Sequence, residues 1–85
     1  MPVISTFYGI VVQIFYFDHN PPHIHATYGE YRVVISIKDQ LVHGTMPKRA
    51  LNLIFEWMDL HRDELLEDWN LAQDGEPLKK IEPLA

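Results

Sequence analysis

Three of the five histidines in the sequence fall within seven consecutive residues, in the stretch Asp18-His19-Asn20-Pro21-Pro22-His23-Ile24-His25. An imidazole titrates close to neutral pH and is the commonest metal ligand among side chains, and a carboxylate stands directly beside the first of them. Two consecutive prolines fix two φ angles and stiffen the connection, which helps to hold the neighbouring side chains in place. This stretch is therefore the candidate working site of the chain.

The pair His23 and His25 favours one interpretation, a metal site. Residues two apart on a strand point to the same face, so a strand here would present two imidazole nitrogens side by side. Either His19 or Asp18 would supply a third ligand across the proline turn. Nitrogen and oxygen ligands of this kind suit a first-row divalent ion such as zinc. One prediction is thus a divalent-metal-binding module with His19, His23 and His25 as its histidine ligands.

The same residues also favour acid–base chemistry without a metal. Two neighbouring histidines can divide the roles of general base and general acid, and Asp18 would orient one of the rings. A cation nearby would hold a phosphate group, and Lys48 and Arg49 fall where the N-terminus of a helix is expected. This second prediction is a ribonuclease-like site. Its catalytic residues would be His19, His23, His25 and Asp18, and its phosphate-binding residues Arg32, Lys48 and Arg49. The third interpretation is a non-catalytic structural or interaction protein, in which the histidines only make structural hydrogen bonds.

The elements that must position these residues begin with strands. Residues 10–17 are rich in β-branched and aromatic side chains and are apolar on both faces, which predicts a strand covered on both sides, by this chain or by a partner. Residues 23–28 and 31–38 predict two more strands joined by a tight turn. A short fourth strand is expected at 41–43, and residues 1–7 are expected to form an extended lead-in.

From Pro47 onwards the apolar residues recur at helical spacing, which predicts a helix. The apolar stripe shifts near His61, which favours two helices with a bend over one straight rod. Gly75 and Pro77 are typical of a helix end. The tail that follows, residues 75–85, has alternating apolar residues and is expected to dock on the sheet.

Together these elements predict one α+β domain over residues 1–85. Residues 1–46 would form a four-stranded antiparallel β-meander, and residues 47–74 two α-helices packed on one face of it. The apolar first strand and the exposed aromatic residues predict further burial, by a homodimer or by a partner protein.

Composition narrows the classes of function. The chain has 85 residues, no cysteine and a net charge of −5, so disulfides and thiolate metal sites are excluded. Nine of the twelve acidic residues lie in residues 51–85, which argues against broad nucleic-acid binding but leaves room for a small positive cleft in the first half. The sequence has neither a run of about 20 apolar residues nor a signal-peptide pattern, so no membrane association and a cytoplasmic location are expected.

The sequence resembles the domain-of-unknown-function family numbered 4160 over nearly its whole length. The resemblance rests on Met1-Pro2, Ile4-Ser5, Phe7, Gly9-Ile10, the stretch from Asp18 to His25, Tyr28-Gly29, Pro47, Arg49-Ala50, Trp57, His61-Arg62, Glu64-Leu65-Leu66, Trp69, Pro77-Leu78, Ile81 and Pro83-Leu84. Its most specific part is the Asp-His-x-Pro-Pro-His-x-His element.

The resemblance implies a protein partner but no catalytic mechanism. The family consists of short bacterial proteins without an established activity, often found beside a second small domain in an arrangement similar to toxin–antitoxin pairs. The resemblance therefore implies a small protein partner encoded nearby and a nuclease-like toxin role, with RNA as the candidate substrate. It supplies no catalytic residues to carry over.

Overall fold

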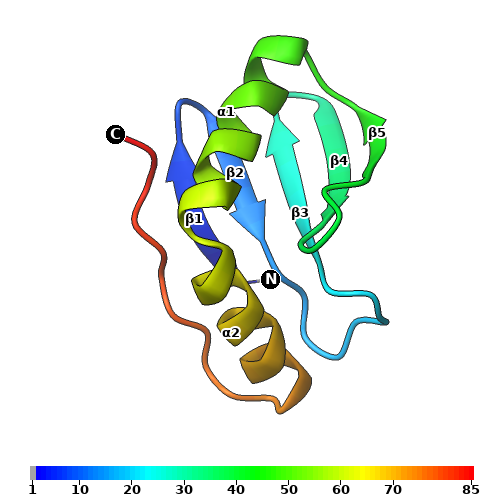
Figure 1. Cartoon of the computed structure of the whole chain (residues 1–85), viewed down its shortest axis with the longest axis vertical. Coiled ribbons are helices and arrows are strands. Elements are labelled where there is room, and N and C mark those ends of the chain that lie inside the picture. The colour runs from blue at the N-terminus through cyan, green and yellow to red at the C-terminus, as the bar shows by residue number, and fades with distance from the viewer. Residues whose placement is uncertain (1) are drawn as a thin grey trace.

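The computed structural model describes residues 2–85 and shows a five-stranded antiparallel sheet followed by two helices (Figure 1). The elements are β1 (Val3–Phe7), β2 (Ile10–Gln13), β3 (His23–Tyr28), β4 (Tyr31–Ser36), β5 (Val42–Thr45), α1 (Lys48–Leu60) and α2 (Arg62–Gln73). The strands pair in chain order, so the sheet is a meander. The prediction of an α+β fold with an antiparallel sheet and two C-terminal helices is confirmed.

The sheet has one strand more than the sequence pattern indicated. The described part of the expected lead-in is β1, which pairs with β2 across a turn at Tyr8 and Gly9. Both turn residues have positive φ, a conformation that glycine adopts readily and tyrosine rarely does. The Tyr8 hydroxyl donates a hydrogen bond to the Ala85 carbonyl oxygen at 2.7 Å, which anchors the side chain of this residue. Met1 lies outside the described residues.

The strand expected over residues 10–17 is shorter than predicted and ends at Gln13. Phe17 has a positive φ of 56°, and its backbone N–H donates to the Ala72 carbonyl oxygen at 3.3 Å. The end of α2 therefore draws the chain away from the sheet before the proline corner. Within the described chain, β2 is also covered on one face only, because Val11 and Gln13 on its other face are half-buried.

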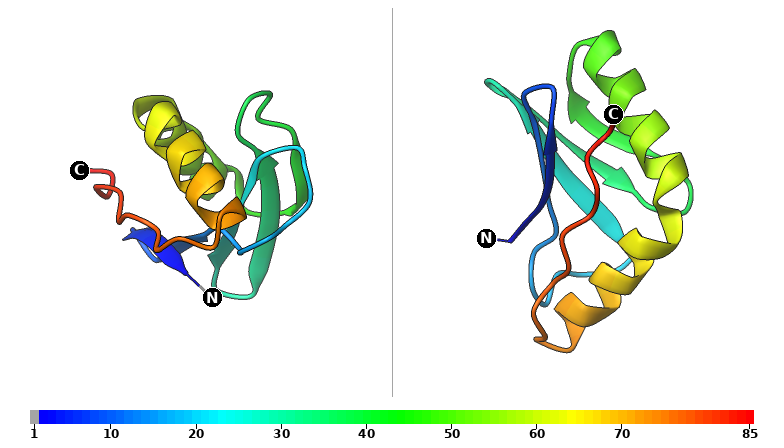
Figure 2. Two further views of the ribbon diagram at one scale, coloured as in Figure 1. Left: turned by 90° about the horizontal axis from the view of Figure 1, so that it is seen from below. Right: turned by 90° about the vertical axis from the view of Figure 1, so that its left-hand side faces the viewer.

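The core lies between the sheet and the two helices, which cover one of its faces (Figure 2). Alternate strand residues such as Ile24, Ala26 and Ile35 are fully buried on that face. The helices meet them with Ile54 and Trp57 from α1, and with Leu65, Trp69 and Ala72 from α2. The helices join at His61, where the backbone leaves helical geometry at φ −127° and ψ 26°. No helix in residues 2–85 is long and apolar enough to cross a bilayer.

The C-terminal tail packs along the outer side of β1 and the helices (Figure 2). The Ile81 N–H donates to the Ile4 carbonyl oxygen at 2.8 Å, and the Trp57 indole N–H donates to the Glu82 carbonyl oxygen at 2.9 Å. The Lys79 N–H donates to the buried Asp68 carboxylate at 2.9 Å. The bond to Ile4 ties the tail to the edge of β1, where it covers part of the strand that could otherwise pair with another chain. The other two bonds tie the tail to α1 and α2.

Candidate functional site

The carboxylate of Asp18 and the rings of His23 and His25 converge on one point. The His23 Nε2 atom lies 2.8 Å from Asp18 Oδ2, and the His25 Nε2 atom lies 3.3 Å from the same oxygen. One ligand atom from each of the three side chains lies within 4.8 Å of the other two. Both histidines stand on β3 two residues apart, as the sequence predicted, and Asp18 reaches them from the β2–β3 connection.

Contacts with α2 and with the end of β4 hold this connection in position. Gln73 Nε2 donates to the Asp18 backbone carbonyl oxygen at 2.9 Å, next to the bond from Phe17 to the last turn of α2. On the far side of the proline corner, the Ile37 N–H donates to the Pro22 carbonyl oxygen at 2.9 Å. The carboxylate is thus carried by a loop that is fixed at both ends.

His23 is oriented by a backbone carbonyl. Its side chain is buried and lies against Trp69, with 5.0 Å between ring centroids. Its Nδ1 atom lies 2.8 Å from the Pro21 carbonyl oxygen, and since a carbonyl can only accept, Nδ1 must donate. In the neutral ring Nε2 then carries a lone pair that faces the Asp18 oxygen. Two lone pairs at that distance need a proton or a metal cation between them.

His25 is more accessible than His23. Its side chain is 24% exposed, and the Phe15 ring stacks on it with centroids 4.0 Å apart. The ring stands on the sheet face that the helices leave open, beside Gln13 on β2 and Val34 on β4, to which it is paired. The cluster therefore has a buried wall at His23 and an open side at His25.

The charge of Asp18 is stabilised by its neighbours. Burial alone would raise the pKa of this carboxyl, but hydrogen bonds from the His19 backbone N–H and from the rings of His25 and His23 outweigh it. The pKa of Asp18 is lowered from 3.8 to about 2. The carboxylate is thus available as an anionic ligand throughout the physiological pH range.

This shift predicts an acid-labile contribution to stability. Ionised Asp18 stabilises the folded state because its pKa is lower there than in the unfolded chain. This stabilisation is complete at a pH above the pKa of the unfolded state, and it is lost as the pH falls through the pKa of the folded state. We expect the free energy of unfolding of the wild-type protein to be larger than that of Asp18→Asn. The difference should be about 2 kcal/mol at pH 5 and about 1 kcal/mol at pH 2.5. Urea unfolding of both proteins at the two pH values measures this difference, and a difference that does not change with pH would contradict the assignment.

The other residues of the predicted site are placed differently. His19 was predicted as a metal ligand, but the three atoms that converge come from Asp18, His23 and His25. The His19 side chain is 84% exposed, and its Nδ1 atom lies 3.0 Å from the outer oxygen of Asp18, Oδ1. His19 therefore flanks the cluster from the solvent side.

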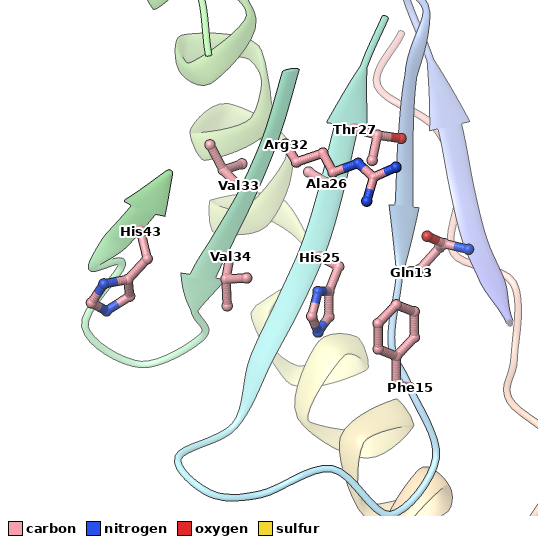
Figure 3. Close-up of a pocket in the computed structure, with 9 residues that line it drawn as sticks. All are labelled: Gln13, Phe15, His25, Ala26, Thr27, Arg32, Val33, Val34 and His43. Atoms are coloured by element: carbon pink, nitrogen blue, oxygen red, sulfur yellow. The ribbon is translucent and has the colours of Figure 1, made fainter. Parts of the chain in front are cut away.

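Arg32 lies on the same open face as His25. It pairs with Thr27 on β3, so its position is two residues, about 7 Å, along the strand from His25. Both residues line a cavity of about 370 Å³ across the open face (Figure 3). An adjoining cavity of about 490 Å³ is lined by Asp18, His19, His23 and His25, and also by His43. The structure thus brings Arg32 towards the cluster.

Lys48 and Arg49 are not brought there. They begin α1 at the upper end of Figure 1, whereas β3 begins with His23 at the lower end. The reason is topological, because β5 runs antiparallel to β4 and carries the chain back to the far end before the helix starts. Arg49 lines a separate cavity with Tyr8 and Tyr28.

Sequence reasoning missed three residues that shape the site. Phe15 stacks on His25, Trp69 packs on His23, and Gln73 holds the Asp18 backbone. For Phe15 a signal existed, since alternation from Val11 and Gln13 places it on the same face as His25. No local signal distinguishes Trp69 and Gln73 from other residues of a helix.

Comparison with known proteins gives one match. A family model described as "Domain of unknown function (DUF4160)" matches residues 9–70, a range that includes Asp18, both clustered histidines and most of the two helices. No curated protein and no solved structure matches the chain significantly.

Proposed function

The chain belongs to the family described as Domain of unknown function (DUF4160), and from this premise we propose that it is a divalent-metal-binding protein whose ion is held by Asp18, His23 and His25. The family description names no activity, so support comes from the three side chains. The observation that carries the proposal is the meeting of two Nε2 atoms at one carboxylate oxygen, while His23 Nδ1 is held by the Pro21 carbonyl oxygen. Metal-binding histidines are commonly oriented by such a bond from the second ring nitrogen.

The spacing of the donor atoms supports this proposal. Zinc binds nitrogen and oxygen ligands at about 2.0–2.1 Å in a tetrahedron, which sets neighbouring ligand atoms roughly 3.3 Å apart. The two nitrogen–oxygen distances here are 2.8 and 3.3 Å, so a small outward movement of the side chains would accommodate the ion. Three protein ligands leave a fourth position for water, the arrangement typical of catalytic zinc.

Metal analysis tests the proposal directly. We expect protein purified without a histidine tag to contain close to one divalent ion per chain, and added zinc to raise the melting temperature of protein stripped by a chelator. Zinc at a hundred times its dissociation constant stabilises the folded state by about 2.7 kcal/mol, or roughly 10–20 °C for a domain of this size. Protein that contains no ion and shows no thermal shift with zinc would overturn the proposal and favour a structural or interaction role.

A second candidate function, ribonuclease-like hydrolysis, is favoured by the position of Arg32 on the open face with His25. The metal-free version of this chemistry has less support, since His23 has both nitrogens engaged, one with Pro21 and one with Asp18. A bound ion would instead supply the nucleophile, because it lowers the pKa of its water. The role of the chain's own residues is then to hold the ion and to bind phosphate.

The proposal extends to partners and location. A small protein partner in a toxin–antitoxin-like pair, a homodimer and a cytoplasmic location are predictions from the family resemblance and the sequence. The open face of the sheet supports a partner, since Val11, Gln13 and Val34 there are half-buried and no helix of the described chain covers them. The exposed Phe17 lies elsewhere, beside Gly75 at the end of α2.

A further inference from the structure

The open face of the sheet carries a groove whose fixed charge is positive. The cavity of about 370 Å³ beside His25 is lined by nine residues, none of them a carboxylate (Figure 3). This is notable in a chain with twelve acidic residues against seven lysines and arginines. The charge comes from Arg32, whose guanidinium group lies across β3 towards β2 in Figure 3.

Arg32 is free to bind a ligand. Within residues 2–85 its side chain makes neither an ion pair nor a hydrogen bond, whereas Arg62 is engaged with backbone carbonyl oxygens and with Asp59. A guanidinium group presents a planar set of five donors that matches two oxygens of a phosphate or carboxylate at once. The side chains of Gln13 and Thr27 add polar groups beside it.

The rest of the groove is apolar and aromatic. Phe15 and Val34 line the end away from Arg32, on either side of His25, and His43 lies beyond Val34. Arg32 is paired with Thr27, which is two residues from His25 on β3. The groove therefore extends about 7 Å along the strands from Arg32 to His25. A ligand that fits has an oxyanion at one end and an apolar ring at the other.

We propose that this groove binds an aromatic phosphate ester of nucleotide type, with its phosphate on Arg32 and its ring over Phe15 and Val34 next to His25. The inference rests on the proposed function in one respect, that His25 also holds the ion. It names the substrate class of that site and places the anion on Arg32 rather than on Lys48 and Arg49, which line or adjoin a different cavity.

Titration with phenyl phosphate, followed by amide chemical shifts, tests the inference. Phenyl phosphate should shift the amides of Gln13, His25 and Arg32 and should bind more tightly than inorganic phosphate, which lacks the ring, and than benzoate, which lacks the phosphate. Arg32→Ala should weaken binding at least about tenfold, and Arg32→Lys should retain part of it, since lysine keeps the charge but not the planar fork. The matched arginine variant, Arg49→Ala, should bind as wild type does.

The outcomes separate this inference from the metal proposal. Arg32→Ala should take up zinc as wild type does, and a folded Arg32→Ala that still binds phenyl phosphate normally overturns the inference. Shifts centred on Tyr8 and Arg49 would overturn it as well, and benzoate binding equal to phenyl phosphate would refute the phosphate assignment. Phenyl phosphate binding at Arg32 in a protein that takes up no zinc would support the groove and reject the metal site.

Discussion

Replacing His25 with alanine should lower the affinity for zinc at least about 100-fold. Loss of a contact that only orients a metal ligand already costs 10- to 100-fold, so removal of a direct ligand should cost more. His25 is the better position for the test because its side chain is partly exposed, whereas His23 is buried against Trp69. Competition with a chelator of known affinity, at fixed pH, measures the change.

The control for His25→Ala is His43→Ala. His43 stands on the same open face and lines both cavities near the cluster, but its nitrogens are not among the atoms that converge. His43→Ala should bind zinc within about twofold of wild type. Thermal unfolding of the metal-free variants checks that loss of the Phe15 contact has not unfolded His25→Ala. Equal losses in the two variants would show that zinc binds elsewhere on this face.

If the chain cleaves RNA and inhibits growth as proposed, the double variant His23→Ala/His25→Ala should cleave RNA at least about 100-fold more slowly and should no longer inhibit growth. Acid–base catalysis alone is typically worth 10²- to 10⁴-fold, and this variant also removes two of the three proposed ligands. The measurements are cleavage of single-stranded RNA by purified protein and growth of a host that expresses it. A double variant that folds and keeps full activity would show that the site has been assigned wrongly.

A second double variant, Lys48→Ala/Arg49→Ala, distinguishes the two proposed phosphate positions. These residues begin α1, at the end of the molecule opposite the start of β3, so their loss should change RNA cleavage by no more than about twofold. A large loss of RNA cleavage would instead support Lys48 and Arg49 as the phosphate-binding residues, as the sequence pattern predicted. If the wild-type protein neither cleaves RNA, nor inhibits growth, nor forms a stable complex with a partner, the toxin proposal is wrong. Zinc binding tests the metal site independently of that outcome.

The sequence was most informative where local and tertiary preferences agree. β3 begins and ends where its alternation and the Gly29 turn predicted, and the helices separate at His61 as the shift in the apolar stripe indicated. β1 was expected only as an extended lead-in, although Val3, Ile4 and Phe7 are of types that favour strands. Its pairing with β2 depends on the turn at Tyr8 and Gly9, where both residues have positive φ. The length of β2 was overestimated because its end is decided by α2, through the bond from Phe17 to Ala72.

The candidate site was predictable in its members and not in its geometry. The spacing of His23 and His25 on a strand sufficed to place both rings on one face. The loop backbone decides whether Asp18 or its neighbour His19 points towards the histidines. Phe17 has a positive φ, and Gln73 donates a hydrogen bond to the Asp18 carbonyl oxygen. The position of Lys48 and Arg49 depends on the direction of β5. Both features therefore depend on parts of the chain outside the motif, Gln73 for the loop and β5 for the two cations.

The contact between Trp69 and His23 gives the molecule an optical reporter of its own site. Their ring centroids are 5.0 Å apart, and the second tryptophan, Trp57, lies on α1 against Phe7 and His61 instead. Indole emission responds to a change in charge on a ring it touches, so capture of a cation or a proton by His23 should alter the fluorescence of Trp69. Occupancy could then be followed in real time in the unlabelled protein, with a Trp57→Phe background isolating the signal.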